Sequence, residues 1–186
     1  MAVAALALIV PLTQADIERA MTLARAAEAE RARFHSRYLL PIGDATVEQI
    51  EIITEFRRVV MLTEERLRRG EYVIMQRDVE AALGGSHGKV TITARLRFHP
   101  LNVFVAAPPY EIGLGVPPLA RLDSRRTPLY ALAGPNQKPG ASAPLVGAMV
   151  EADFDAATVG QATRPVRVML EGKEVVRTMV DFGRLE

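Results

Sequence analysis

The chain has 186 residues, 49% of them hydrophobic and 24% charged, so it is long enough to bury a core and too apolar to be disordered. Its 23 basic and 22 acidic residues give a net charge of +1, which provides no electrostatic footprint for nucleic acid. The absence of cysteine excludes thiolate catalysis, zinc–thiolate sites and iron–sulfur clusters. We therefore expect no cofactor and no nucleic-acid partner.

The first segment, residues 2–10, is continuously apolar and ends at Pro11. It is shorter than the ~20 residues of a transmembrane helix, so we expect no transmembrane span, but it matches the ~7–15-residue core of a signal peptide. Thr13 and Ala15 are small residues at signal-peptidase spacing, so residues 1–15 are predicted to be a signal peptide cleaved after Ala15. Alternatively, this run is a buried helix or strand, and Thr13 and Asp16 form a capping box for the next helix.

Residues 16–84 are predicted to be mostly helical with one strand. Apolar side chains recur at helical spacing over residues 16–33. The β-branched density of "VEQIEIITEFRRVVML" favours a strand over residues 50–61. Two short helical pieces follow in "TEERLRRGEY" and "IMQRDVEAALGG", with Gly70 between them.

Residues 85–186 are predicted to be mostly β. The clearest strand is "KVTITARLRFHP", in which apolar and polar residues alternate. The apolar face of this strand comprises Val90, Ile92, Ala94, Leu96 and Phe98. A second alternating run is "LVGAMVEADFDAATV", and a closing hairpin is predicted around Gly172 and Lys173. Short β-like runs at 103–106, 110–114 and 119–122 are limited by prolines to sheet edges or strand ends.

This order of elements predicts an α+β fold, in which N-terminal helices precede an antiparallel β-sandwich or a strongly curved β-sheet. Strands at short spacing, joined by turn residues and not by long helices, favour antiparallel pairing. Residues 16–186 are expected to form a single domain. No pattern in the sequence indicates the oligomeric state.

The sequence contains no assembled catalytic motif. "GGSHG" places Ser86 in the G-x-S-x-G pattern, but that motif must follow a strand and open a helix. Here a helical piece precedes it and a strand follows, so we interpret it as a helix end and a turn. The three histidines, His35, His87 and His99, lack the spacing of a helical metal site. We therefore predict no catalytic residue and no metal ligand.

The segment "EADFD" places Glu151, Asp153 and Asp155 on one strand face and invites a calcium interpretation. Alternate residues of a strand are ~6.6 Å apart, so the outer two carboxylates lie ~13 Å from each other. A calcium ion holds its oxygen ligands at ~2.3–2.6 Å, so these two cannot share one ion on a straight strand. A solvated acidic face is the better interpretation.

Arg95, Arg97 and His99 form the polar face of the clearest strand and are the candidate binding residues. We expect them to pair with the acidic face of "EADFD" in a cross-strand ladder; the alternative is a free face that meets an anionic partner.

The sequence predicts an exported bacterial protein, periplasmic or secreted, that acts as a non-enzymatic β-rich binding or assembly module with an envelope protein as partner. Without a signal peptide the protein would be cytoplasmic. Two alternatives stay open. One is a hydrolase whose site is assembled from His35, His99 and carboxylates; the other is a small-ligand carrier with an apolar pocket between helices and sheet.

Overall fold

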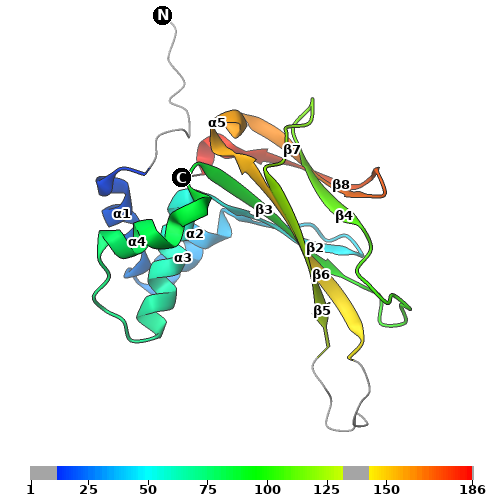
Figure 1. Cartoon of the computed structure of the whole chain (residues 1–186), viewed down its shortest axis with the longest axis horizontal. Coiled ribbons are helices and arrows are strands. Elements are labelled where there is room, and N and C mark those ends of the chain that lie inside the picture. Colours follow the sequence, from blue (N-terminus) through cyan, green and yellow to red (C-terminus); the bar gives the residue numbers. More distant parts are fainter. Residues whose placement is uncertain (1–11, 132–142, 186) are drawn as a thin grey trace, which may run out of the picture.

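The computed structural model describes residues 12–131 and 143–185, which form a helical part followed by two antiparallel sheets. The elements in chain order are α1 (Gln14–Ala24), α2 (Glu28–Ser36), β1 (Leu39–Pro41), β2 (Val47–Ile53), α3 (Glu55–Arg68), α4 (Gln76–Leu83), the 3₁₀ turn Gly84–Ser86, β3 (Lys89–Arg97), β4 (Tyr110–Leu114), β5 (Asp123–Tyr130), β6 (Leu145–Asp155), α5 (Ala156–Val159), β7 (Thr163–Leu170), β8 (Lys173–Asp181) and the 3₁₀ turn Phe182–Arg184. Helices α1–α4 gather on one side of the strands (Figure 1). The predicted α+β class is confirmed.

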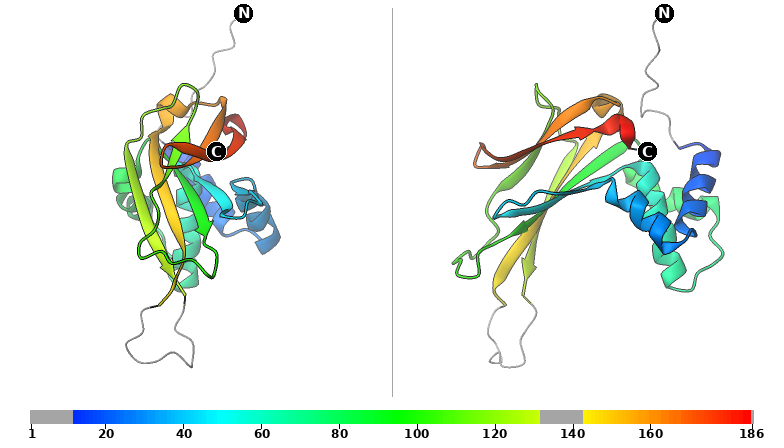
Figure 2. Two further views of the ribbon diagram at one scale, coloured as in Figure 1. Left: turned by 90° about the vertical axis from the view of Figure 1, so that its right-hand side faces the viewer. Right: turned by 180° about the vertical axis from the view of Figure 1, so that it is seen from behind.

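The strands form a five-stranded sheet of order β1-β2-β3-β6-β5 and a three-stranded sheet of order β4-β7-β8. Both edge strands of the larger sheet contain a proline, Pro41 in β1 and Pro128 in β5. Two views at right angles show the smaller sheet on one side of the larger sheet and the helices on the other (Figure 2). Side chains from both sheets fill the space between them, among them Ile50, Ile92 and Leu114, which are fully buried.

The predicted alternation in β3 is confirmed on its apolar face. Val90 to Phe98 on that face are all buried, and Arg95 and Arg97 on the other face are exposed. Thr91 and Thr93 also lie on the polar face but are buried, because the N-terminal half of β3 is covered on both faces. Both faces of β3 are therefore buried in its N-terminal half, and only one face is buried at its C-terminal end.

The predicted strand over residues 50–61 is wrong beyond Ile53, because α3 begins at Glu55. Thr54 caps this helix, and its side-chain oxygen accepts the backbone N–H of Arg57 at 3.2 Å. Phe56, Val59, Val60 and Thr63 then share one buried helix face. The β-branched residues of this segment are buried and recur at helical spacing. The strand prediction considered their residue type and not their spacing.

The helix predicted over residues 16–33 begins earlier and is divided into α1 and α2. Thr13 caps α1 through the capping box with Asp16, as one of the two sequence interpretations requires. Most of the predicted signal peptide, residues 1–11, lies outside the described residues. Cleavage after Ala15 would fall in the first turn of α1 and remove its cap.

In the second half, β4 and the β7–β8 hairpin are confirmed, and β5 was missed. The hairpin turn is Glu171–Gly172, both with positive φ, one residue before the predicted position. The runs predicted at 103–106 and 119–122 are not strands. The polar segment that forms β5 carries Pro128 and is an exposed edge strand, so it lacks the alternation that reveals half-buried strands.

Candidate functional site

Arg95 and Arg97 lie on the exposed face of β3, near its C-terminal end, as predicted. Both guanidinium groups contact one carboxylate, that of Glu48 on the neighbouring strand β2. Arg95 Nε lies 3.2 Å from Glu48 Oε2, and Arg97 Nη1 lies 3.3 Å from Glu48 Oε1. The three side chains together carry one excess positive charge, so this corner of the sheet attracts an anionic group.

A β-bulge in β2 gives Glu48 its position. Val47 pairs with Leu96, and Gln49 pairs with Arg95, so Glu48 is the extra residue of β2. A bulge bends its strand and re-aims a side chain. Strict alternation does not anticipate a bulge, and the sequence therefore did not reveal Glu48 as the partner of the two arginines.

The proposed charge ladder between β3 and β6 is wrong, although the two strands are neighbours. Their antiparallel register sets Arg97 opposite Gly147 and Asp153 opposite Thr91. The basic residues therefore lie at one end of the strand pair and the acidic residues at the other, and each set has different partners.

His99 follows β3 and shapes the next turn. Its Nδ1 accepts the backbone N–H of Leu101 at 3.1 Å, and its carbonyl accepts the backbone N–H of Asn102 at 2.9 Å. The Asn102 side chain donates to the carbonyls of His99 and Leu145, at 2.8 and 3.0 Å. It also accepts the Phe104 N–H at 3.0 Å. Asn102, which the sequence analysis did not single out, thus fixes the loop to the start of β6.

The loop after His99 presents three aliphatic side chains to solvent, Leu101, Val103 and Val105, which we call the apolar tip. Their exposed fractions are 83%, 90% and 96%. Phe104 points the other way and packs edge-on against the buried Phe98, with ring centroids 5.2 Å apart. The loop projects from the molecule on the side away from α1–α4 (Figure 1). The sequence predicted a short β-like run over residues 103–106 of this loop, where the structure has no strand.

Ser86 lies in a 3₁₀ turn and not in the strand-to-helix turn of a nucleophile elbow. It ends the 3₁₀ turn that follows α4, and Gly84 caps α4 with positive φ, as the interpretation of "GGSHG" as a helix end predicts. His87 Nδ1 lies 2.6 Å from Glu55 Oε1 at the start of α3. The strand–turn–helix context of a nucleophile elbow is absent from this segment.

His35 is held between an arginine and a glutamate. Arg57 Nε donates to His35 Nδ1 at 3.4 Å. Because Nδ1 accepts, Nε2 carries the proton and donates to the Glu64 carboxylate at 3.1 Å. The buried Arg57 also donates to the Ile52 carbonyl and the Glu51 carboxylate, each at 2.5 Å. Both imidazole nitrogens are engaged, so His35 has none free for a substrate in this arrangement.

A second polar cluster joins α3 to the covered part of the sheet. Thr91 Oγ1 donates to Asp153 Oδ1 at 2.6 Å and accepts from Arg58 Nη2 at 2.7 Å. Burial lowers the pKa of the Arg58 guanidinium below its ordinary value, and the nearby Asp153 carboxylate opposes this effect. The hydroxyl of Thr91 therefore links a buried carboxylate to a half-buried cation.

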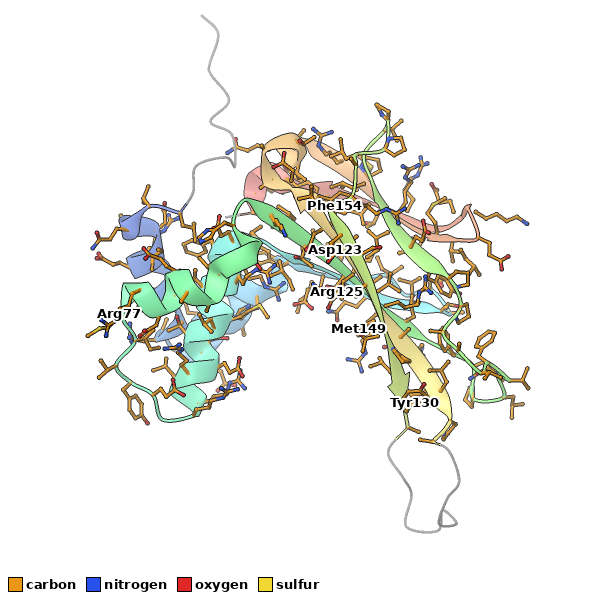
Figure 3. The ribbon with its side chains drawn as sticks, in the orientation of Figure 1. Arg77, Asp123, Arg125, Tyr130, Met149 and Phe154 are labelled. Atoms are coloured by element: carbon orange, nitrogen blue, oxygen red, sulfur yellow. The ribbon has the colours of Figure 1, made fainter. Side chains whose placement is uncertain are left out.

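The other two carboxylates of "EADFD" also have separate partners. Arg125 of β5 lies on the face of the sheet toward the helices (Figure 3), and its Nη2 is 3.1 Å from Glu151 Oε2. Asp155 caps α5, and hydrogen bonds from the side chain and backbone of Thr158 lower the pKa of its carboxyl group. Within residues 12–131 and 143–185, no group of three His, Asp or Glu side chains is placed to hold a metal ion. Over the same residues, no helix is long and apolar enough to cross a membrane.

Comparisons with known proteins give no relatives for this chain. No protein-family model, no curated protein and no solved structure matches it. The candidate surface is therefore judged on its own geometry.

Proposed function

We propose that the protein is exported and acts as a non-enzymatic binding module of the bacterial envelope. Its docking surface would combine the apolar tip with Arg95 and Arg97 at the end of β3. The observation that carries this proposal is the exposure of three aliphatic side chains on the loop that directly follows β3, the strand whose exposed end carries two arginines that share one glutamate. A protein partner with an apolar socket and an acidic rim would satisfy both features.

The contacts that anchor the loop support a docking role. Hydrogen bonds from Asn102 and the packing of Phe104 hold the backbone, so the tip would lose little conformational freedom on binding. Each aliphatic side chain of the tip contributes roughly 1.5–3 kcal/mol if it becomes fully buried. Three such side chains would form the apolar centre of an interface, and the arginines would belong to its polar rim.

The two alternatives have less support. Both nitrogens of His35 are engaged, and His99 lies beyond the end of β3, where it holds a turn. The carrier was expected to have an apolar pocket between helices and sheet, but the hollow of 640 Å³ between α3 and β2 is lined by charged residues such as Glu51, Arg58 and Glu64. A filled sandwich with an exposed apolar loop fits an interaction module better.

A site-specific photo-crosslinker at Val103 in the native host tests the docking surface. We expect a discrete adduct with one envelope protein, and a weaker adduct when Arg97→Glu is added. Met179 of β8 is the matched control position, because it is 58% exposed on the other sheet. Equal adducts from both positions, or vesicle flotation that depends on the tip without any protein adduct, would contradict a protein partner.

Export is tested separately by the N-terminus of protein recovered from the native host. The signal-peptide prediction requires an envelope pool that begins at or near Asp16. Intact Met1 on cytoplasmic protein, with no envelope pool, would overturn the export part of the proposal and leave the docking surface to be judged by crosslinking.

A further inference from the structure

A groove of 890 Å³ lies on the helical side of the molecule, between α1 and α2 and against the start of α3. Its apolar floor includes Leu23, Phe34 and Phe56. The two phenylalanines are buried and meet with ring centroids 5.9 Å apart. From behind, α1 and α2 lie on the side of the molecule away from the β5–β6 pair (Figure 2). This groove is therefore remote from the apolar tip.

The walls of the groove are strongly basic. They contain four arginines and one acidic residue, Glu30. Two of the arginines already have partners within the chain. Arg19 forms an ion pair with Asp16 at 3.3 Å, and Arg25 donates a hydrogen bond to the Met21 carbonyl.

The other two arginines, Arg33 and Arg37, come from the C-terminal end of α2 and are exposed. Neither has an ion-pair partner among residues 12–131 and 143–185. Two arginines without an ion pair in that part of the chain thus stand beside an apolar floor, and Glu30 is the one carboxylate among the residues that line the groove.

We propose that this groove binds a long-chain fatty acid in its carboxylate form. The guanidinium fork matches a carboxylate in geometry and charge, so Arg33 and Arg37 would hold the head group. The hydrocarbon chain would lie over the partly exposed Leu23 and Ala26, above the buried Phe34 and Phe56. The volume lies within the ~300–1,000 Å³ of small-molecule sites. This site is additional to the docking surface proposed above.

A neighbouring hollow of 590 Å³ carries less uncompensated positive charge than the groove. Arg37 lines both, but the second hollow also contains Arg184 and Asp181. These two side chains pair at 3.0 Å, so most of its charge is compensated internally. An anionic head group is therefore attracted more strongly to the groove of Arg33 and Arg37, because these two arginines have no ion-pair partner among the residues that the structure describes.

Isothermal titration calorimetry on the full chain with three soluble probes tests the proposal. Decanoate is expected to bind saturably at one site, with an affinity that falls as salt is added. Decyltrimethylammonium, which has the same chain and a positive head, should bind at least tenfold more weakly. Butyrate, which has the head without the chain, should also bind at least tenfold more weakly, because the buried apolar area supplies much of the affinity.

Variants locate the site. The double substitution Arg33→Ala with Arg37→Ala should weaken decanoate binding about tenfold or more, since charge-assisted bonds to the head group are lost. Arg77→Ala on α4 is the matched control, because its side chain is 79% exposed and lies outside the groove. Ala26→Phe, which fills the groove, should abolish binding without a loss of thermal stability. Val103→Ser in the apolar tip should leave the decanoate affinity unchanged.

Three results would overturn the proposal. The first is the absence of saturable decanoate binding to the folded wild-type chain. The second is equal affinity for the cationic probe, which would reduce the groove to a generic apolar surface. The third is an equal effect of Arg77→Ala and the groove variants. Thermal unfolding of each variant confirms that the compared proteins are folded.

Discussion

The hydroxyl of Thr91 links two charged groups in the covered part of the sheet, and Thr91→Val removes it while keeping the shape of the side chain. Thr91 donates to Asp153 and accepts from Arg58, at 2.6 and 2.7 Å. The side chain is 4% exposed, so water cannot replace the lost bonds freely. Asp153 is buried as well, and the substitution leaves its carboxylate short of one donor.

The expected loss of stability follows from these two bonds. A hydrogen bond to a charged group contributes about 1.5–3 kcal/mol. The added methyl group of valine returns roughly 0.8 kcal/mol by burial. We therefore expect Thr91→Val to reduce the free energy of unfolding by about 2–5 kcal/mol, which corresponds to a Tm decrease of roughly 4–20 °C for a domain of this size.

Thr93→Val is the matched control for this experiment. Thr93 lies on the same strand and the same face, is 3% exposed, and within the described residues its side chain has no hydrogen-bond partner. Chemical denaturation of both variants should show a change within about 0.5 kcal/mol for Thr93→Val. Equal changes for the two variants would refute the claim that the Thr91 hydroxyl stabilises this cluster.

Three further results are expected. Phe98→Ala should cost about 3–5 kcal/mol in chemical denaturation because it empties a buried aromatic site, and a change near zero would mean that the β3 faces are misassigned. Thr13→Ala should cost about 1 kcal/mol by removing the α1 cap. The Thr13 hydroxyl lowers the pKa of Asp16 from its ordinary value of 3.8. The stability that this hydrogen bond contributes is therefore present above pH 3.8 and is lost as the pH falls below it. Thr13→Ala should accordingly lose less stability on acidification than the wild type does. Arg97→Ala and Glu48→Ala should be non-additive by about 0.2–1 kcal/mol in a double-mutant cycle, whereas additive effects would mean that this exposed pair contributes nothing.

Local patterns predicted the parts of the fold in which one face is buried. β3 and the β7–β8 hairpin follow directly from alternation and from a glycine-containing turn. The helix α3 did not, because its buried face is rich in valine, which favours strands elsewhere. β5 has no buried face to reveal it, since it lies at an edge and is largely exposed.

The candidate surface was predicted only in part, for a related reason. The exposure of Arg95 and Arg97 follows from strand alternation, and both are exposed in the structure. Their partner Glu48 depends on a bulge, and the outward direction of Val103 depends on how Asn102 anchors the loop. Such features arise from contacts between segments far apart in the chain, which periodicity within one segment does not encode.

The prolines at both edges of the five-stranded sheet have a consequence for the behaviour of concentrated protein. A strand from a second molecule that joined β1 or β5 would meet a residue without an N–H, and on β5 it would also meet the charges of Asp123 and Arg125. Fibre growth by strand addition is therefore disfavoured along the larger sheet. In the smaller sheet, β8 is a nine-residue edge strand without proline, in which Val175 and Met179 are exposed. Any cross-molecular β-pairing in aged or heated samples should therefore begin at β8, and a proline introduced there would suppress it.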